Sequence, residues 1–191
     1  WRSAQYCPQE LEERRLGEEF NVVQKSRCEL NRLRGERVFS ASAVAPGTHV
    51  VAAPAGAVEV ELRLRPGTAQ RSGIRVRSDG AGEYTEIGYD AAARAVYLDR
   101  GRAGRAGFHP QFAARHSAPV ALSGAELPLR LLIDQGSVTV FAGQGEAVLT
   151  DQIFPAPGAN GITVFSEGGQ ALAADLNIWS MKPVWRPGAN R

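Results

Sequence analysis

The sequence has few of the residues that mark several common protein classes. Among its 191 residues are two cysteines, three histidines and only two lysines, Lys25 and Lys182. No apolar run approaches the roughly 18 residues that a transmembrane helix needs, and the formal net charge is only +2. We therefore expect neither a membrane nor a nucleic acid as a partner.

Motifs for metal and cofactor chemistry are also missing. His49, His109 and His116 do not have the spacing of a zinc site, and neither cysteine lies near one of them in sequence. The sequence contains no G-x-S-x-G elbow, no phosphate-binding G-x-x-x-x-G-K-[ST] loop and no G-x-G-x-x-G opening a helix. The sequence therefore predicts no metal and no cofactor, and it argues against an enzyme.

Cys7 and Cys28 leave two interpretations open. In an oxidising compartment a disulfide between them would stabilise the N-terminal region by about 3 kcal/mol, whereas in a reducing one they are two small apolar side chains. The chain starts at Trp1 without an initiator Met or a secretion signal, so we expect it to be a piece of a longer protein.

Alternating apolar and polar residues predict strands through most of the chain. In residues 58–65, apolar residues alternate with Glu and Arg, and Pro66 and Gly67 end the run. The same pattern predicts strands at 73–77, 84–89, 95–98, 129–133, 138–141, 147–149, 161–165 and 172–178. Residues 8–19 differ: a proline, then acids, then arginines predict a short helix there.

This series of short strands, with turn signals between them, predicts an all-β fold. An antiparallel two-sheet β-sandwich of the jelly-roll or concanavalin-like type would bury one face of each sheet against the other. Periodicity alone leaves a closed barrel open. We expect residues 1–35 to be a linker segment with a short helix, and residues 36–191 to be the sandwich module.

Polar side chains gather at predicted strand ends. For each acid alone, a turn role is the simpler explanation. Together, carboxylates, an arginine, an amide and a tyrosine are the groups that hold vicinal sugar hydroxyls. The candidate carbohydrate-binding residues are Glu86, Tyr89, Asp99, Arg100, Asp134 and Gln135, with Tyr84 or Trp179 flanking the sugar ring.

Several segments resemble the C-terminal domain of glycoside hydrolase family 32, the invertases, inulinases and levanases. The most specific is the run LRLLIDQGSVTVFAGQG at 129–145, followed by VLTDQIFP at 148–155. The segments IGYD at 87–90, LDR at 98–100 and LNIWSM at 176–181 also resemble the family and occur in the same order along the chain. Residues 5–14, QYCPQELEER, are similar to the linker that leaves the family's catalytic propeller.

The resemblance implies a non-catalytic part of a larger enzyme. The propeller motifs of the family, W-M-N-D-P-N-G, R-D-P and E-C, do not occur in residues 1–191, so no catalytic residue is expected in this chain. Where the family usually has an Arg and a Glu in its signature strands, this chain has Gln135 and Thr139. Secretion is implied by the resemblance alone.

Two functions follow from this resemblance. The first is a carbohydrate-binding module that holds the terminal fructose of levan-type or inulin-type fructans, as the related family 66 module does. The alternative is a structural accessory domain that stabilises the catalytic β-propeller of a β-fructosidase. In that case we expect a sheet face of the isolated domain to expose a broad apolar patch.

Overall fold

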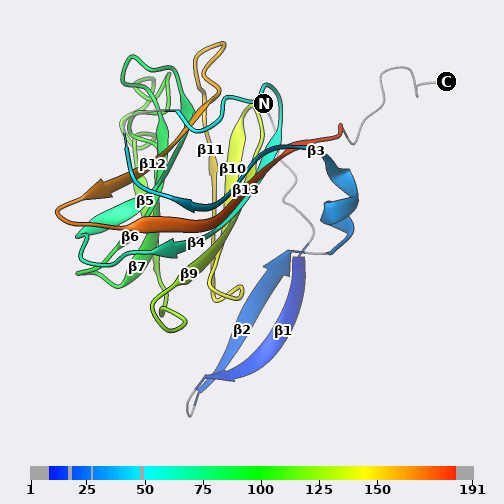
Figure 1. The fold of residues 1–191 in the computed structure, drawn as a ribbon, viewed down its shortest axis with the longest axis vertical. Coiled ribbons are helices and arrows are strands. Elements are labelled where there is room, and N and C mark those ends of the chain that lie inside the picture. The colour runs from blue at the N-terminus through cyan, green and yellow to red at the C-terminus, as the bar shows by residue number, and fades with distance from the viewer. Residues whose placement is uncertain (1–8, 17–18, 27, 48–49, 184–191) are drawn as a thin grey trace.

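The chain folds into two packed antiparallel sheets with a separate hairpin at one end (Figure 1). This computed structural model describes residues 9–16, 19–26, 28–47 and 50–183. Its elements are β1 (Gln9–Leu16), β2 (Glu19–Ser26), the 3-10 helix η1 (Cys28–Leu33), β3 (Arg34–Val44), β4 (Val58–Arg65), β5 (Arg71–Ser78), β6 (Thr85–Asp90), β7 (Ala95–Asp99), β8 (Arg115–Pro119), β9 (Leu127–Ile133), β10 (Ser137–Ala142), β11 (Ala147–Gln152), β12 (Gly161–Glu167) and β13 (Leu172–Met181).

The core lies between a six-stranded and a five-stranded sheet. The strand orders are β11-β10-β9-β4-β13-β3 and β12-β5-β6-β7-β8. In β4, Val60 and Leu64 are fully buried and join one hydrophobic cluster with Ile74 and Ile87 of the other sheet. The alternation of apolar residues along each strand is therefore what brings the two sheets together.

The predicted two-sheet sandwich is confirmed, and so are all the strands predicted between residues 58 and 178. The sheets keep separate edge strands, β11 and β3 in one and β12 and β8 in the other, so they do not close into a barrel. Strands β3 and β8 were not predicted. Among the described residues, no helix is long and apolar enough to span a membrane.

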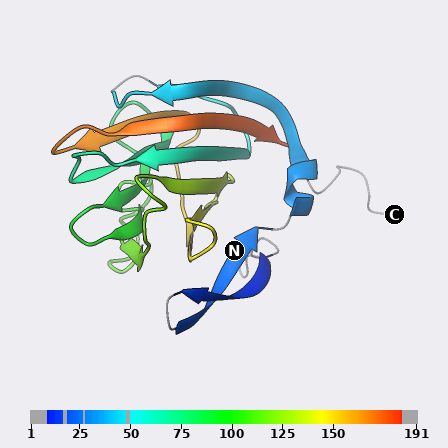
Figure 2. The same cartoon turned by 60° about the horizontal axis from the view of Figure 1, so that its bottom comes forward.

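The predicted helix over residues 8–19 is wrong. Strands β1 and β2 form an antiparallel hairpin with Gln9 opposite Ser26, and the helical segment is η1, further along the chain (Figure 2). A helix would have had little to bury on the sandwich, because Leu11 and Leu16 are the segment's only large apolar residues. The hairpin instead brings the fully buried Val23 of β2 into contact with the rest of the protein.

Candidate functional site

The hairpin docks on the turn between β10 and β11. The backbone N–H of Gln24 donates to the carbonyl oxygen of Gly145 at 2.8 Å. The Arg14 guanidinium donates to Oε1 of Gln144 at 3.1 Å and lies 3.9 Å from the Glu146 carboxylate. Backbone and side-chain contacts together hold the hairpin against the sandwich.

A buried carboxylate anchors the segment that joins the hairpin to β3. Glu59 is fully buried, and Arg34 donates to both of its oxygens at 2.9 and 2.6 Å. Arg130 Nε lies 2.6 Å from Glu59 Oε1, and its other nitrogens donate to Ser26 at 2.6 Å and Asn31 at 2.8 Å. The hydrogen bonding of Arg34 to the Glu59 carboxylate raises the pKa of Arg34. One carboxylate therefore binds two arginines, of which Arg130 also reaches β2 and η1.

The face of the hairpin away from the docked side exposes three large apolar side chains, which alternate with the charged Glu13 and Arg15. Directly opposed residues of an antiparallel pair share a face, and side chains alternate along each strand. The register pairs Glu12 with Val23 on one face and Glu13 with Val22 on the other. Leu11, Phe20 and Val22 share that second face and are 67%, 67% and 61% exposed. These three residues form what we call the outer stripe.

A groove of about 670 Å³ lies between the end of β2, the β10–β11 turn and strands β4, β9 and β13. Its volume is within the range of small-molecule binding sites. Lys25, Arg63, Gln144 and Asp175 are among its polar lining residues, and Phe141 supplies apolar surface. No site residue from the sequence prediction lines this groove.

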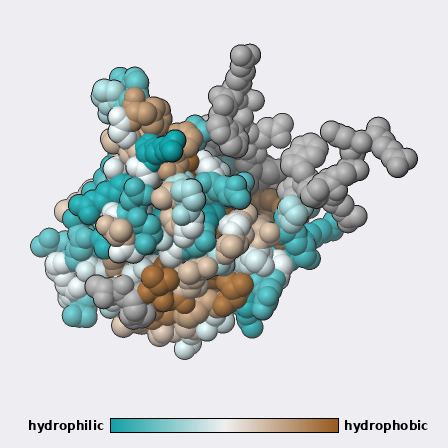
Figure 3. Space-filling model, turned by 90° about the horizontal axis from the view of Figure 1, so that it is seen from above, coloured by the Kyte–Doolittle hydropathy of each residue, from teal (hydrophilic) through white to brown (hydrophobic). Residues whose placement is uncertain are grey.

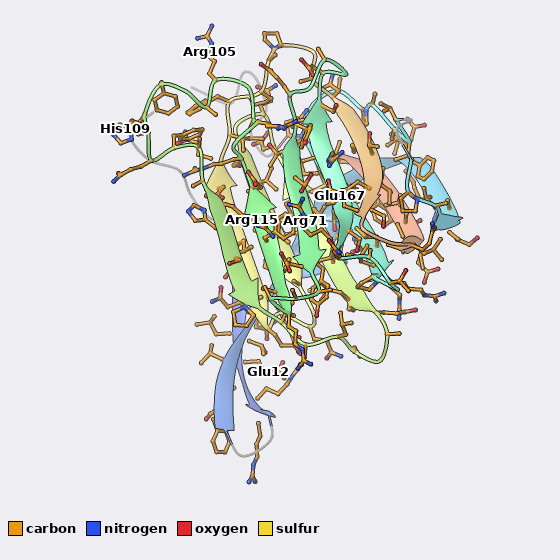
Figure 4. All side chains as sticks on the ribbon, turned by 90° about the vertical axis from the view of Figure 1, so that its left-hand side faces the viewer. Glu12, Arg71, Arg105, His109, Arg115 and Glu167 are labelled. Atoms are coloured by element: carbon orange, nitrogen blue, oxygen red, sulfur yellow. The ribbon has the colours of Figure 1, made fainter. Side chains whose placement is uncertain are left out.

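The outer face of the five-stranded sheet carries a row of paired charges (Figure 4). Arg75 donates to Glu86 at 2.7 Å and to Glu167 at 2.9 Å, and Arg71 donates to Glu167 at 2.5 Å. The Arg115 guanidinium lies 3.6 Å from the centroid of the Tyr97 ring. These side chains therefore interact with one another across the outer face of the sheet.

Tyr97 makes the stability of the folded chain depend on pH in the alkaline range. Its hydroxyl is fully buried with the side chain and donates to Glu86 at 2.8 Å; burial, followed by the nearby Glu86 charge, raises the Tyr97 pKa. Below a pH of about 10 the tyrosine is protonated in both states, so its contribution to stability is complete. Above that pH the unfolded chain releases the proton first, and the contribution is lost.

We therefore expect Tyr97→Phe to flatten the fall of stability with rising pH. The urea midpoint of the unmodified chain should decrease more steeply above a pH of about 10 than that of the variant. At neutral pH the variant should lose about 1–3 kcal/mol with the hydrogen bond to Glu86. Equal slopes for the two proteins would contradict the assignment to Tyr97.

The structure brings three of the predicted sugar-binding residues to the same part of the five-stranded sheet. Glu86 and Asp99 are opposed in the β6–β7 register. Tyr84 precedes β6, and its ring lies 4.6 Å from the Arg75 guanidinium. Glu86 is 7% exposed and bonded to Arg75 and Tyr97, while Asp99 accepts from the Gly101 N–H at 2.8 Å.

The other predicted residues lie elsewhere. Tyr89 belongs to the core and is 5% exposed. Arg100 lies at the edge toward β11, where it donates to the Gln152 carbonyl at 3.1 Å and stacks 4.2 Å from the Phe112 ring centroid. Asp134 and Gln135 occupy the exposed β9–β10 turn, where the Asp134 carboxylate accepts from the Gln135 N–H.

Trp179 and the cysteines complete the predicted set. Trp179 is on the six-stranded sheet, opposite Glu59, and the Arg34 guanidinium lies 3.9 Å from its ring centroid. Cys28 is exposed, and Cys7 lies outside the described residues. The described residues contain no cluster of His, Cys, Asp and Glu that could hold a metal ion. The predicted sugar-binding residues thus do not form one pocket.

Sequence reasoning missed the hairpin, the Glu59 anchor and the groove. The period-two placement of Phe20 and Val22 around Asn21 is a strand signal, but it covers too few residues to stand out beside the acids and arginines before it. Glu59 follows the same alternation as the exposed polar residues of β4, so its burial has no signal in the sequence. It depends on Arg34 and Arg130, which come from other strands.

Comparison with known proteins gives consistent matches. The family described as glycosyl hydrolases family 32 C terminal matches residues 29–180. The chain is 31% identical over 191 residues to a levanase of Bacillus subtilis, covering 97% of this chain and 28% of that protein. It is 28% identical over 191 residues to an extracellular exo-inulinase of Aspergillus awamori, covering 97% of this chain and 36% of that protein.

A solved structure extends the match to the fold. The crystal structure of exo-inulinase from Aspergillus awamori superposes with a TM-score of 0.85 at 27% identity, over 97% of this chain and 37% of that one. The present chain thus spans little more than a third of these relatives at most. Since the family match covers most of the sandwich, the chain belongs to the C-terminal domain family of the family 32 glycosyl hydrolases.

Proposed function

We propose that this chain is the accessory β-sandwich of a secreted, fructan-degrading glycoside hydrolase, and that it braces the catalytic domain through its N-terminal hairpin. The observation that carries the proposal is the two-sided hairpin. One side buries Val23, while the other leaves Leu11, Phe20 and Val22 exposed. The names of the relatives, levanase and extracellular exo-inulinase, support the fructan substrate and the secretion.

The outer stripe suits contact with a second protein domain. Burying a Leu, Phe or Val side chain is worth about 1.5–3 kcal/mol relative to leaving it exposed. On the face seen from above in Figure 3, brown and tan apolar residues gather in the lower half, and teal hydrophilic residues lie mainly above and beside them. Half of the exposed large apolar residues among the described part of the chain belong to the hairpin, which makes it the preferred contact rather than a sheet face.

A rigid connection is what bracing requires, and the Glu59 anchor supplies it. Arg130 joins Glu59 of the sandwich to Ser26 at the end of β2 and to Asn31 in η1. The orientation of the hairpin is therefore fixed by side chains on both sides of the connection. A partner packed on the outer stripe would be held in a defined position relative to the sandwich.

The double substitution Leu11→Ser and Phe20→Ser tests the bracing function. Both side chains are about two-thirds exposed, so the isolated chain should unfold within about 0.5 kcal/mol of the unmodified one. In the full-length enzyme, the thermal unfolding temperature of the catalytic domain should fall, because the apolar contact is lost. Calorimetry of both proteins measures the two effects.

Val38→Ser is the matched control, because Val38 is an exposed apolar residue of β3, 39% exposed, outside the hairpin. In the full-length enzyme, Val38→Ser should leave the thermal unfolding temperature of the catalytic domain unchanged. An unchanged unfolding temperature in the double variant as well would refute the bracing function.

Carbohydrate binding is a second candidate function, favoured by the polar groove beside the hairpin. The residues predicted from the sequence are divided between the core, two sheet faces and a turn, so they do not support a single fructose pocket. The groove offers a different location.

A further inference from the structure

We propose that the groove between the hairpin and the six-stranded sheet binds a neutral oligosaccharide. This inference goes beyond the bracing function and does not rest on it. Its volume of about 670 Å³ accommodates a short sugar chain. Its walls come from β2, from the β10–β11 turn and from β4, β9 and β13, so a ligand would touch the hairpin and the sandwich together.

The polar lining contains both hydrogen-bond donors and hydrogen-bond acceptors. Lys25 and Arg63 supply N–H donors, Asp175 supplies carboxylate acceptors, and Gln144 and Ser123 supply both kinds of group. A sugar hydroxyl donates one hydrogen bond and accepts others, so a chain of hydroxyls needs this mixture. Phe141 and Pro128 add apolar surface for the C–H groups of a sugar ring.

The charges around the groove are paired, which favours an uncharged ligand. Lys25 forms an ion pair with Glu12. Arg63 Nε lies 3.4 Å from Asp175 Oδ2, and Arg130 is engaged with Glu59. A phosphate or carboxylate ligand would have to displace one of these carboxylates. A neutral polyol can instead form hydrogen bonds with the lone pairs and N–H groups that are not used within the ion pairs.

Asp175 occupies a backbone position that aims a polar side chain at this site. Its φ of 50° is in the left-handed region, which costs most residues about 1–2 kcal/mol and is tolerated best by Asn, Asp and Gly. The register of β13 with β4 shifts between Ala174 and Asn177. Bulges of this kind redirect side chains and are frequent beside functional sites.

The ion pair with Arg63 does not account for Asp175. The two side chains are 57% and 64% exposed, and exposed pairs contribute little to stability. Asn177 Nδ2 donates to the Asp175 carbonyl oxygen at 2.9 Å, so the backbone at residue 175 is held within the chain while its carboxylate stays largely open to solvent. A ligand hydroxyl that donates a hydrogen bond to this carboxylate would give it a partner.

The test compares Asp175→Asn with Asp134→Asn in the 191-residue chain. Asn keeps the left-handed conformation and the size of residue 175 but removes its charge and one acceptor oxygen. Asp134 is a matched control, because it is an exposed aspartate on the β9–β10 turn outside the groove, and it is a sugar ligand in the sequence prediction. The probes are short levan and inulin oligosaccharides, measured by calorimetry and by NMR titration.

We expect at least one of these oligosaccharides to bind, and Asp175→Asn to weaken that binding about tenfold or more. Asp134→Asn should stay within about twofold, and both variants should unfold like the unmodified chain. The NMR shifts should gather on residues of β2 and the β10–β11 turn. These results would not test the bracing function, because that function is tested by the unfolding temperature of the catalytic domain.

Three outcomes would overturn the proposal. One is the absence of binding by any of the oligosaccharides. Another is a loss of affinity in Asp134→Asn with none in Asp175→Asn, which would move the site to the residues predicted from the sequence. The third is tighter binding of dextran sulfate than of the neutral oligosaccharides at the same residues, which would show that the groove prefers an anion.

Discussion

Replacing Glu59 with Ala is expected to destabilise the chain by about 3–5 kcal/mol, because it breaks a buried ion pair by removing one partner. The Glu59 side chain is fully buried, and its oxygens contact Arg34 and Arg130, whose side chains are only 21% and 17% exposed. The substitution would leave these two guanidinium groups with less counter-charge in a largely dry environment. Urea unfolding followed by circular dichroism measures the loss.

Glu61→Ala is the matched control, since Glu61 also pairs with Arg34 but is 38% exposed. We expect it to cost less than about 1 kcal/mol, as exposed pairs do. Glu59→Gln should fall between the two, because the amide keeps the shape of the side chain without its charge. Equal losses for Glu59→Ala and Glu61→Ala would mean that burial does not control the energy of this network.

The sandwich was predictable because most of its strands carry their own signal. In β4 the inward residues are apolar and the outward ones are Glu and Arg, and in β9 every inward residue is apolar, so each strand can be recognised without its neighbours. Strand β8, with the sequence RHSAP, and the hairpin lack this contrast. Their structure depends on pairing with segments far along the chain, which local alternation does not report.

The candidate site was less predictable, because it depends on which faces the sheets turn outward. Tyr89 and Glu86 are neighbours in a promising motif, yet the strand alternation places Tyr89 in the core and Glu86 among paired charges. Trp179 is an aromatic residue near a strand end, but Arg34 stacks on it. One wall of the groove is the end of β2, and the sequence predicted a helix over residues 8–19 and no strand over residues 19–26, so the groove could not be located from the sequence.

Gly145→Ala is expected to release the hairpin from the sandwich. Gly145 has a φ of 94°, and a Cβ there would lie 2.5 Å from the backbone oxygen of Gln24 and 2.9 Å from its carbonyl carbon. The left-handed conformation alone costs about 1–2 kcal/mol, and the contact with a backbone cannot be relieved by a side-chain rotation. We expect the free energy of unfolding to fall by about 2–4 kcal/mol in total. Amide hydrogen exchange should become much faster in β2 than in β4.

Gly158→Ala separates the conformational cost of a left-handed alanine from the cost of the contact with a neighbouring backbone. Gly158 has a similar φ of 84°, but a Cβ there would meet nothing within 4 Å, so only the conformational cost of about 1–2 kcal/mol applies and exchange in β2 should not change. If Gly145→Ala behaves in the same way, the backbone contact at Gln24 does not hold the hairpin. If it frees β2, the variant also removes one wall of the groove and the support of the outer stripe. Both functions then depend on a contact that only a glycine permits.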